Sequence, residues 1–183
     1  MKRETRPALV VCTGPESSGK TALARRLGDY LQAPLVEEMA RPVLTRKGGQ
    51  YQPTDLLNIA HAQLQAEDQA MQLALTQHAD WVVADTDLQV IYVWWQELFG
   101  PAPTSLVRQY AVQSSRHYLL CEPDLPWEAD ALRENPHDRQ RLFEHYHNDL
   151  RARQASFAVV SSTGEARWQS ALRGLQIFRS GNG

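Results

Sequence analysis

Residues 14–21, which read GPESSGKT, combine side chains and a spacing that suit the binding of phosphate groups. They satisfy every fixed position of the phosphate-binding loop (P-loop) pattern GxxxxGK(S/T), between a short apolar run and a helical pattern. Two glycines permit a tight path whose N–H groups converge on phosphate oxygens. Lys20 can reach the outer phosphates of a nucleotide, and the Thr21 hydroxyl can bind Mg²⁺. We predict that phosphates contact Gly14, Pro15, Glu16, Ser17, Ser18, Gly19, Lys20 and Thr21.

Asp85 is the candidate for the second Mg²⁺ ligand that a P-loop requires, which usually ends a neighbouring buried strand. The apolar run 81–84 breaks into Asp85-Thr86-Asp87, and a parallel strand would carry these carboxylates to the ligand crevice. The alternative is a helix N-cap, because the same residues precede a helical segment that starts at Leu88. Both roles are compatible, with Asp85 on the metal and Asp87 as a cap or a substrate contact.

The segment Glu37-Glu38-Met39-Ala40-Arg41 follows the second apolar run. A carboxylate here can orient an acceptor hydroxyl and take its proton as a phosphoryl group arrives. Arg41 can steady phosphate charge or hold the glutamate. The alternative is a solvated loop with an ordinary surface ion pair, and the residues alone favour neither interpretation.

Residues 126–141 form a candidate lid that brings arginines to the phosphates. The segment contains Arg133, Arg139 and Arg141, and two prolines interrupt it. Arginine charge is valuable there, because positioning and electrostatics supply most of the catalysis of phosphoryl transfer. The alternative is a basic, solvated helix face, which we favour for Arg139.

Five short apolar runs predict the strands that position these residues. The runs are continuous rather than alternating, as expected where helices cover both faces of a sheet. The predicted strands are residues 8–13, 35–37, 81–84, 117–121 and 157–161.

Amphipathic segments between these runs predict helices. Leu23, Leu27 and Leu31 are spaced four apart, and a long pattern follows Thr54, which we expect to be its cap. The predicted helices are residues 20–31, a long segment from 54 to 79, and residues 88–99, 139–153 and 165–178. Alternating strands and helices predict an α/β fold: a P-loop kinase-like, three-layer sandwich with a mainly parallel five-stranded sheet.

Composition supports one soluble domain spanning residues 1–183. The chain has 19 Lys plus Arg against 21 Asp plus Glu, a net charge of −2, which argues against a general nucleic-acid binder. No apolar run approaches the roughly 20 residues that cross a bilayer. Two cysteines without metal-ligand spacing suit a reducing cytoplasm, so we expect a cytoplasmic protein without a membrane partner.

Taken in order, these pieces resemble the ribosylnicotinamide kinase domain of the bifunctional bacterial NAD-biosynthesis regulators and its stand-alone P-loop relatives. The resemblance spans roughly residues 9–150. It rests on GPESSGKT, on the Glu-x-x-Arg of Glu38 and Arg41, on Asp85-Thr86-Asp87, and on the Trp-x-x-Asp-x-Leu-Arg from Trp127 to Arg133, with Arg141 at the family's spacing beyond.

The resemblance implies a kinase that moves the γ-phosphate of ATP, with Mg²⁺, to the 5′-hydroxyl of nicotinamide riboside. It makes Glu38 the base rather than Glu37, since only Glu38 has the spacing to Arg41, and it places Trp127 and Arg133 in a lid over the phosphates. The chain would be the kinase module alone.

Two alternatives stay open for the function. One is a regulatory P-loop NTPase that acts as a nucleotide-dependent switch or sensor. The other is a kinase for another riboside, because acceptor choice depends on the shape of the pocket. Trp94, Trp95 and Tyr51 are candidates for stacking on an acceptor ring, although such aromatics usually belong to the core. By fold analogy, residues 161–164 and Arg167 lie where an adenine commonly binds.

Overall fold

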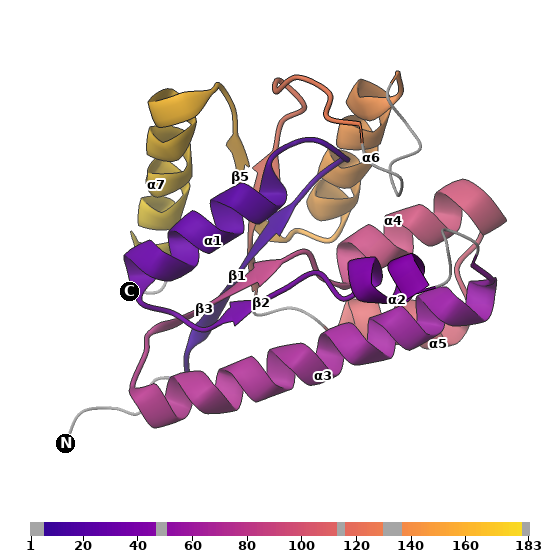
Figure 1. Cartoon of the computed structure of the whole chain (residues 1–183), viewed down its shortest axis with the longest axis horizontal. Helices are drawn as coiled ribbons and strands as arrows, with labels where there is room; N and C mark the ends of the chain where they lie inside the picture. The colour runs from indigo at the N-terminus through magenta and orange to yellow at the C-terminus, as the bar shows by residue number, and fades with distance from the viewer. Residues whose placement is uncertain (1–5, 47–50, 113–115, 130–136, 181–183) are drawn as a thin grey trace.

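A five-stranded parallel sheet lies at the centre of the molecule in a computed structural model that describes residues 6–46, 51–112, 116–129 and 137–180 (Figure 1). The strand order is β2-β3-β1-β4-β5, so the strand that leads into the P-loop is central. Its Val10 pairs with Val83 on one side and with His117 on the other. The strands are β1 (Ala8–Thr13), β2 (Leu35–Val36), β3 (Trp81–Asp85), β4 (Arg116–Cys121) and β5 (Ser156–Val160).

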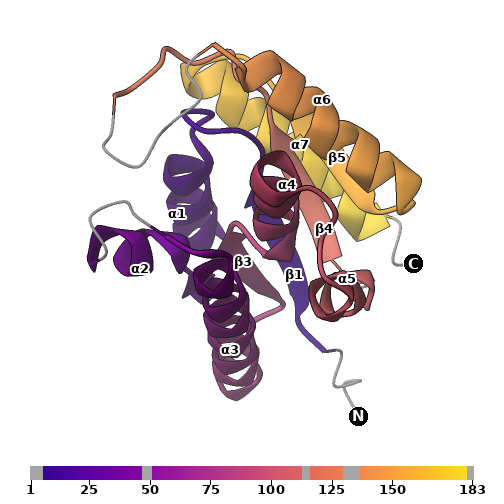
Figure 2. The ribbon, with the colours of Figure 1, turned by 90° about the vertical axis from the view of Figure 1, so that its right-hand side faces the viewer.

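Helices connect the strands and cover both faces of the sheet (Figure 2). Side chains that alternate along β1 divide the core into two clusters. Val10 and Cys12 pack with α1 and α7, whereas Leu9 and Val11 pack with α3, α4 and α6. The helices are α1 (Lys20–Leu31), α2 (Ala40–Arg46), α3 (Pro53–Gln77), α4 (Leu88–Phe99), α5 (Thr104–Ala111), α6 (Arg139–Ala152) and α7 (Gly164–Ser180). The predicted three-layer α/β architecture is confirmed.

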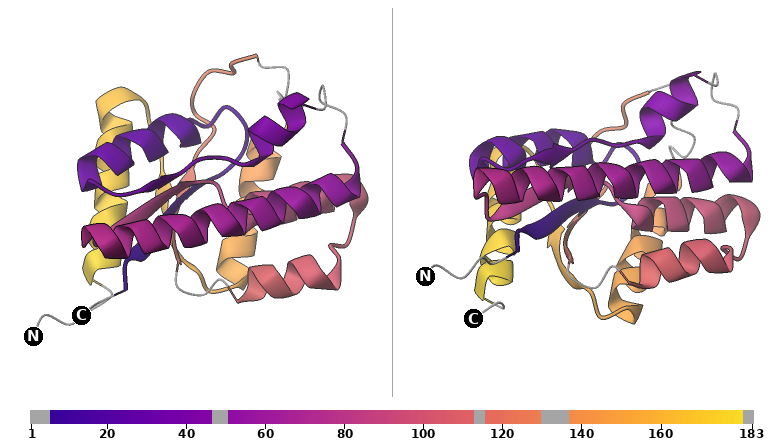
Figure 3. Two further views of the ribbon diagram at one scale, coloured as in Figure 1. Left: turned by 60° about the horizontal axis from the view of Figure 1, so that its bottom comes forward. Right: turned by 90° about the horizontal axis from the view of Figure 1, so that it is seen from below.

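A third apolar cluster lies at the N-terminal half of α3, which extends past the sheet and runs beside α4, with α5 on the other side of α4 (Figure 3). It joins Leu44 of α2, Ile59 of α3, Trp95 of α4 and Leu106 of α5. The short helices α2 and α5 were not predicted. None of the helices in the described part of the chain has the combination of length and apolar character that a bilayer crossing needs.

The start of α3 differs from the prediction. The helix begins at Pro53, and Gln52 is its N-cap, whereas Thr54 lies inside the first turn. The backbone N–H of Gln52 donates to the Asp55 carboxylate, which closes a reciprocal capping arrangement. Proline is well suited to the first helical position because its missing N–H has no helical partner there. The proposed Thr54 cap was therefore wrong.

Candidate functional site

The P-loop joins β1 to α1 at the carboxyl edge of the sheet. Gly14 and Gly19 both have positive φ, 130° and 75°. A Cβ on Gly14 would lie 2.7 Å from the carbonyl oxygen of Cys121, so the loop's contact with β4 leaves no room for a side chain. The Pro15 carbonyl accepts hydrogen bonds of 2.7 Å from both the Ser18 hydroxyl and the Lys20 ammonium. The P-loop thus holds the Lys20 ammonium group through its own backbone.

A cavity of about 610 Å³ opens against the P-loop, and all eight predicted phosphate-contacting residues line it. Glu38 and Arg41 line the same cavity. Its remaining wall is largely apolar and comes from α2, α4, α6 and the segment after β4: Leu44, Val90, Val93, Trp94, Leu98, Leu125, Pro126 and Leu142. The cavity therefore places a phosphate-binding loop, the Glu38 carboxylate and an apolar surface around a single space, with Glu97 and Glu128 also in its wall.

The two adjacent glutamates have different surroundings. Glu37 is 69% exposed, pairs with Arg25 at 3.4 Å and is absent from the cavity wall. Glu38 is only partly exposed and lines the cavity. The alternative of an exposed surface ion pair thus describes Glu37, and Glu38 is the carboxylate that can meet a ligand.

Asp85 ends β3 and pairs in register with Cys12, immediately before the P-loop. Its Oδ1 is buried without a hydrogen-bond partner. Burial raises the pKa of this carboxyl, and a hydrogen bond from Thr21 and the charge of Lys20 oppose the rise. An orphaned carboxylate oxygen beside a threonine hydroxyl fits a Mg²⁺ ion that takes its other ligands from phosphates and water. Among the described residues, no group of three or more His, Cys, Asp or Glu side chains is arranged to hold a metal ion.

Asp87 is the N-cap of α4, which was one of its two predicted roles. Its side chain is fully buried and accepts from the Gln89 N–H at 2.9 Å, the Tyr118 hydroxyl at 2.9 Å and Arg116 at 3.0 Å. It does not line the cavity. The geometry corrects the prediction that Asp87 contacts substrate, because its carboxylate is already occupied by protein donors.

Gln63 of α3, which the sequence did not indicate, joins the two segments next to the candidate carboxylates Glu38 and Asp85. Its side-chain oxygen accepts from Met39 N–H at 3.3 Å, next to Glu38. Its side-chain nitrogen donates to the Thr86 carbonyl at 3.1 Å, next to Asp85. Gln63 is 1% exposed, so this bridge lies inside the molecule.

The arginines of the candidate lid are placed differently from the predictions. Arg139, expected on a solvated face, donates to the Ser17 carbonyl at 3.3 Å and the Leu125 carbonyl at 2.9 Å, and lies over the Trp127 ring. Arg141, predicted to bind nucleotide, instead pairs with Glu97 at 2.6 Å and Asp138 at 2.8 Å. Neither Trp127 nor Arg141 lines the cavity, and Arg133 lies outside the described residues.

The two tryptophans predicted as stacking candidates lie in different surroundings. Trp94 lines the cavity, and its indole N–H donates to the Tyr51 hydroxyl at 3.1 Å. Trp95 belongs to the apolar cluster around α3. Only Trp94 of the two tryptophans can therefore face a bound ring.

A protein-family model described as an AAA domain matches residues 9–167 of the chain. No curated protein matches the chain.

Several solved structures share the fold. NadR protein in complex with NAD and AMP-PNP superposes with a TM-score of 0.72 at 21% identity, over 94% of this chain and 50% of that one. NadR protein in complex with NR gives 0.71 at 19% identity, over 94% and 52%. Thymidylate kinase from Ehrlichia chaffeensis gives 0.66 at 15% identity, over 95% and 100%. The chain therefore spans about half the length of the NadR chains. The predicted P-loop kinase-like fold and the resemblance to the NAD-biosynthesis regulators are confirmed as likenesses of fold.

Proposed function

Because the chain belongs to this AAA-domain family and has the fold of P-loop kinases, we propose that it is an ATP-dependent kinase for a nucleoside 5′-hydroxyl, with nicotinamide riboside as the preferred acceptor. The observation that carries the proposal is the shared cavity, in which the P-loop, Glu38 and an apolar wall surround one space. A NadR structure in complex with NR has the same fold, which supports this choice of acceptor.

The nucleotide half of the reaction belongs to the P-loop. Backbone N–H groups of the P-loop would hold the phosphates, except at Pro15, which has none, and Lys20 would exchange the Pro15 carbonyl for the outer phosphates. Thr21 and Asp85 would hold Mg²⁺, which when bound neutralises charge that develops on the phosphate oxygens.

The acceptor half belongs to Glu38 and the apolar wall. The 5′-oxygen bonds to the γ-phosphorus as the bond from that phosphorus to the bridging oxygen of ADP breaks, and Glu38 takes the hydroxyl proton. Arg41 would steady the charge on the transferred group, and Trp94 offers a flat surface for the acceptor ring. The products are ADP and a nucleoside monophosphate.

The lid retains a part in this proposal. Arg133 and Trp127 would cover the phosphates, and Arg141 would reach them after leaving Glu97 and Asp138. Both of its ion pairs are partly exposed, so the exchange has a small energetic barrier. We further propose that residues 1–183 act as one domain on small-molecule substrates in the cytoplasm, without nucleic acid or membrane.

The test is mass spectrometry of the purified protein with Mg²⁺ and ATP and a panel of ribosides, nicotinamide riboside first. We expect nicotinamide mononucleotide and ADP to appear in equal amounts. Lys20→Ala should remove most turnover, and Glu38→Gln should lower kcat by a factor of about 10² to 10⁴. Glu37→Gln is the matched control, because its exposed ion pair contributes little.

Each other outcome has a definite meaning. Phosphorylation of a different riboside would keep the kinase and replace the acceptor. Release of ADP and phosphate without any phosphorylated riboside would overturn the proposal in favour of a nucleotide-dependent switch. Full activity of Glu38→Gln would remove Glu38 from the role of base.

A further inference from the structure

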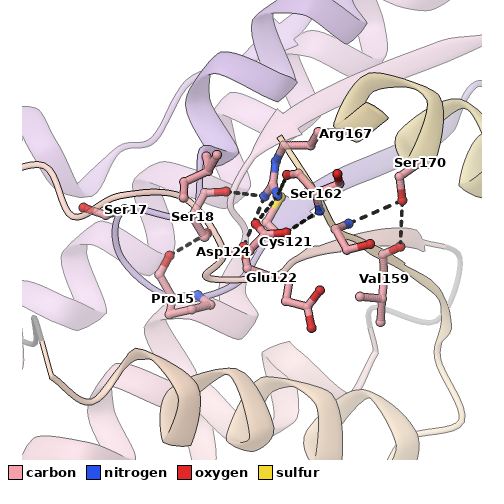
Figure 4. Close-up of polar contacts among 12 residues, drawn as sticks. Pro15, Ser17, Ser18, Cys121, Glu122, Asp124, Val159, Ser162, Arg167 and Ser170 are labelled. Carbon is pink, nitrogen blue, oxygen red and sulfur yellow. Dashed lines mark hydrogen bonds and ion pairs between the residues drawn. The ribbon is translucent and has the colours of Figure 1, made fainter. Parts of the chain in front are cut away.

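Arg167, at the start of α7, contacts four residues from three segments at the edge of the P-loop (Figure 4). One Nη donates to the Ser18 carbonyl at 2.5 Å, and the other pairs with Asp124 at 2.6 Å. The guanidinium also donates to the carbonyls of Ser162 at 3.0 Å and Glu122 at 3.3 Å. The Arg167 side chain is only 8% exposed, so these contacts form a built site and not a surface pairing.

A second arginine contacts the preceding P-loop peptide. Arg139 of α6 donates to the Ser17 carbonyl at 3.3 Å and anchors itself on the Leu125 carbonyl at 2.9 Å. Two helices from the C-terminal third of the chain thus hold two consecutive carbonyls of a loop near its N-terminus.

Holding a carbonyl fixes the direction of the next amide. A trans peptide is planar, and its N–H points opposite to its C=O. When Arg139 binds the Ser17 oxygen, the N–H of Ser18 points away from Arg139, and when Arg167 binds the Ser18 oxygen, the N–H of Gly19 points away from Arg167. These are two of the donors with which a P-loop surrounds phosphate.

The loop conformation requires such support. Ser17 has φ 51°, in the left-handed region that residues with a side chain rarely adopt, and Gly19 has φ 75°. Positive φ at alternate positions turns successive N–H groups toward one centre, where their dipoles repel each other until an anion binds. Hydrogen-bond donors from outside the loop, such as the two guanidinium groups, counteract this repulsion because they hold the carbonyls of the same peptides in place.

We propose that Arg167 and Arg139 are positioning residues that hold the Ser17 and Ser18 carbonyls and thereby aim the P-loop amides at phosphate. This inference rests on the proposed nucleotide-binding function. It replaces the expectation that Arg167 recognises adenine, because both of its terminal nitrogens are already bound to protein oxygens. Asp124 also balances the charge of Arg167, so this arginine acts through the loop and not as a phosphate ligand.

The test is titration calorimetry of the full chain with Mg²⁺ and ATP and, separately, with inorganic tripolyphosphate. Arg167→Gln should lower the affinity for both ligands by a factor of about 10 or more, because the loss of groups that orient ligating atoms typically has an effect of this size. Arg167→Lys should also weaken both, because a lysine lacks the planar fork that reaches several carbonyls. In steady state, the KM for ATP should rise while the KM for the acceptor stays constant. Arg173→Gln, an exposed arginine of the same helix, is the control.

Thermal unfolding separates misfolding from loss of positioning. If Arg167→Gln does not fold, Arg139→Gln tests the neighbouring carbonyl from a partly buried position. Equal affinity of the wild type and the folded variants for tripolyphosphate would overturn the inference. Weaker binding of ATP with unchanged binding of tripolyphosphate would also overturn the inference. That result would indicate that the arginine contacts the adenine base of ATP. If the wild type binds neither ligand, the proposed function itself fails.

Discussion

Asp85 is a carboxylate whose ionisation the ligand-free fold opposes. Its buried Oδ1 lacks a hydrogen-bond partner, and burial raises its pKa above that of the unfolded chain. Between the unfolded and the folded pKa values, the folded state binds more protons than the unfolded state. The free energy of unfolding of the protein therefore falls as the pH rises through this interval. A bound cation would offset the cost of burying the ionised Asp85 carboxylate.

Asp85→Asn should for this reason be more stable and less active. We expect its Tm to exceed that of the wild type by a few degrees at about pH 8 without metal, and the difference to shrink as the pH falls below about 3.9, the unfolded pKa, where the carboxyl is protonated in both states. Turnover should fall by a factor of about 100. Thermal unfolding across this pH range and kcat at saturating Mg²⁺ check the two parts. A destabilised variant with normal turnover would contradict the assignment of Asp85 to the metal.

The helix α3 positions the site from outside the cavity. Its Gln63 connects the loop after β2, which carries Glu38, to Thr86, which directly follows Asp85 at the end of β3. The same amide approaches Glu67, which pairs with Arg116 and so connects α3 to β4. The relative placement of Glu38 and Asp85 is therefore supported by one buried amide.

Gln63→Leu should disturb both loops at once. The change leaves the Met39 N–H and the Thr86 carbonyl without their partner inside the protein, which costs about 1–3 kcal/mol of unfolding free energy. We also expect kcat to fall at saturating substrates, because the two carboxylates lose their common support. Urea denaturation and kcat are the measurements, and the exposed Gln72→Leu on the same helix is the control. A variant as stable and active as the control would show that the bridge has no such function.

Elements with a strong local pattern could be predicted from the sequence. Continuous apolar runs located all five strands to within one residue at each end, and leucines at helical spacing located α1. The helices α2 and α5 have seven and eight residues, too few for a period to emerge, and Pro42 interrupts the first of them. They fold because the cluster around α3 covers them, which is a tertiary effect that the local sequence does not contain.

Some residues of the candidate site could likewise be predicted from local sequence patterns, and others could not. The P-loop and Asp85 occupy positions that short motifs mark, and both lie where the motifs place them. Arg139 and Arg167 reach the loop across 122 and 149 residues, and a lone arginine in a helix has no local pattern that reveals such a partner. Glu37 and Glu38 are neighbours of the same type, and only the turn of the chain after β2 decides which of them faces the cavity.

The C-terminal helix α7 packs on the sheet and brings Arg167 into contact with the P-loop near the N-terminus of the chain. This packing depends on Gly174. A Cβ there would lie 2.7 Å from Leu119 Cδ2 and 3.0 Å from the Ala158 Cβ, both on the strands beneath. Gly28 in α1 offers a contrast, because a Cβ there would meet its nearest neighbours at 3.6 and 3.7 Å, ordinary contact distances.

The same substitution at these two glycines should therefore have opposite effects. Gly174→Ala forces α7 away from the sheet and should lower the free energy of unfolding by about 1–3 kcal/mol, as overpacking does. Gly28→Ala should raise it by about 0.5–1 kcal/mol, because alanine loses less backbone entropy in a helix. Urea denaturation measures both. Since α7 bears Arg167, Gly174→Ala should also raise the KM for ATP, whereas Gly28→Ala should leave it unchanged. Equal stabilisation by both alanines would mean that α7 does not need close contact with the sheet, and that Arg167 reaches the P-loop without it.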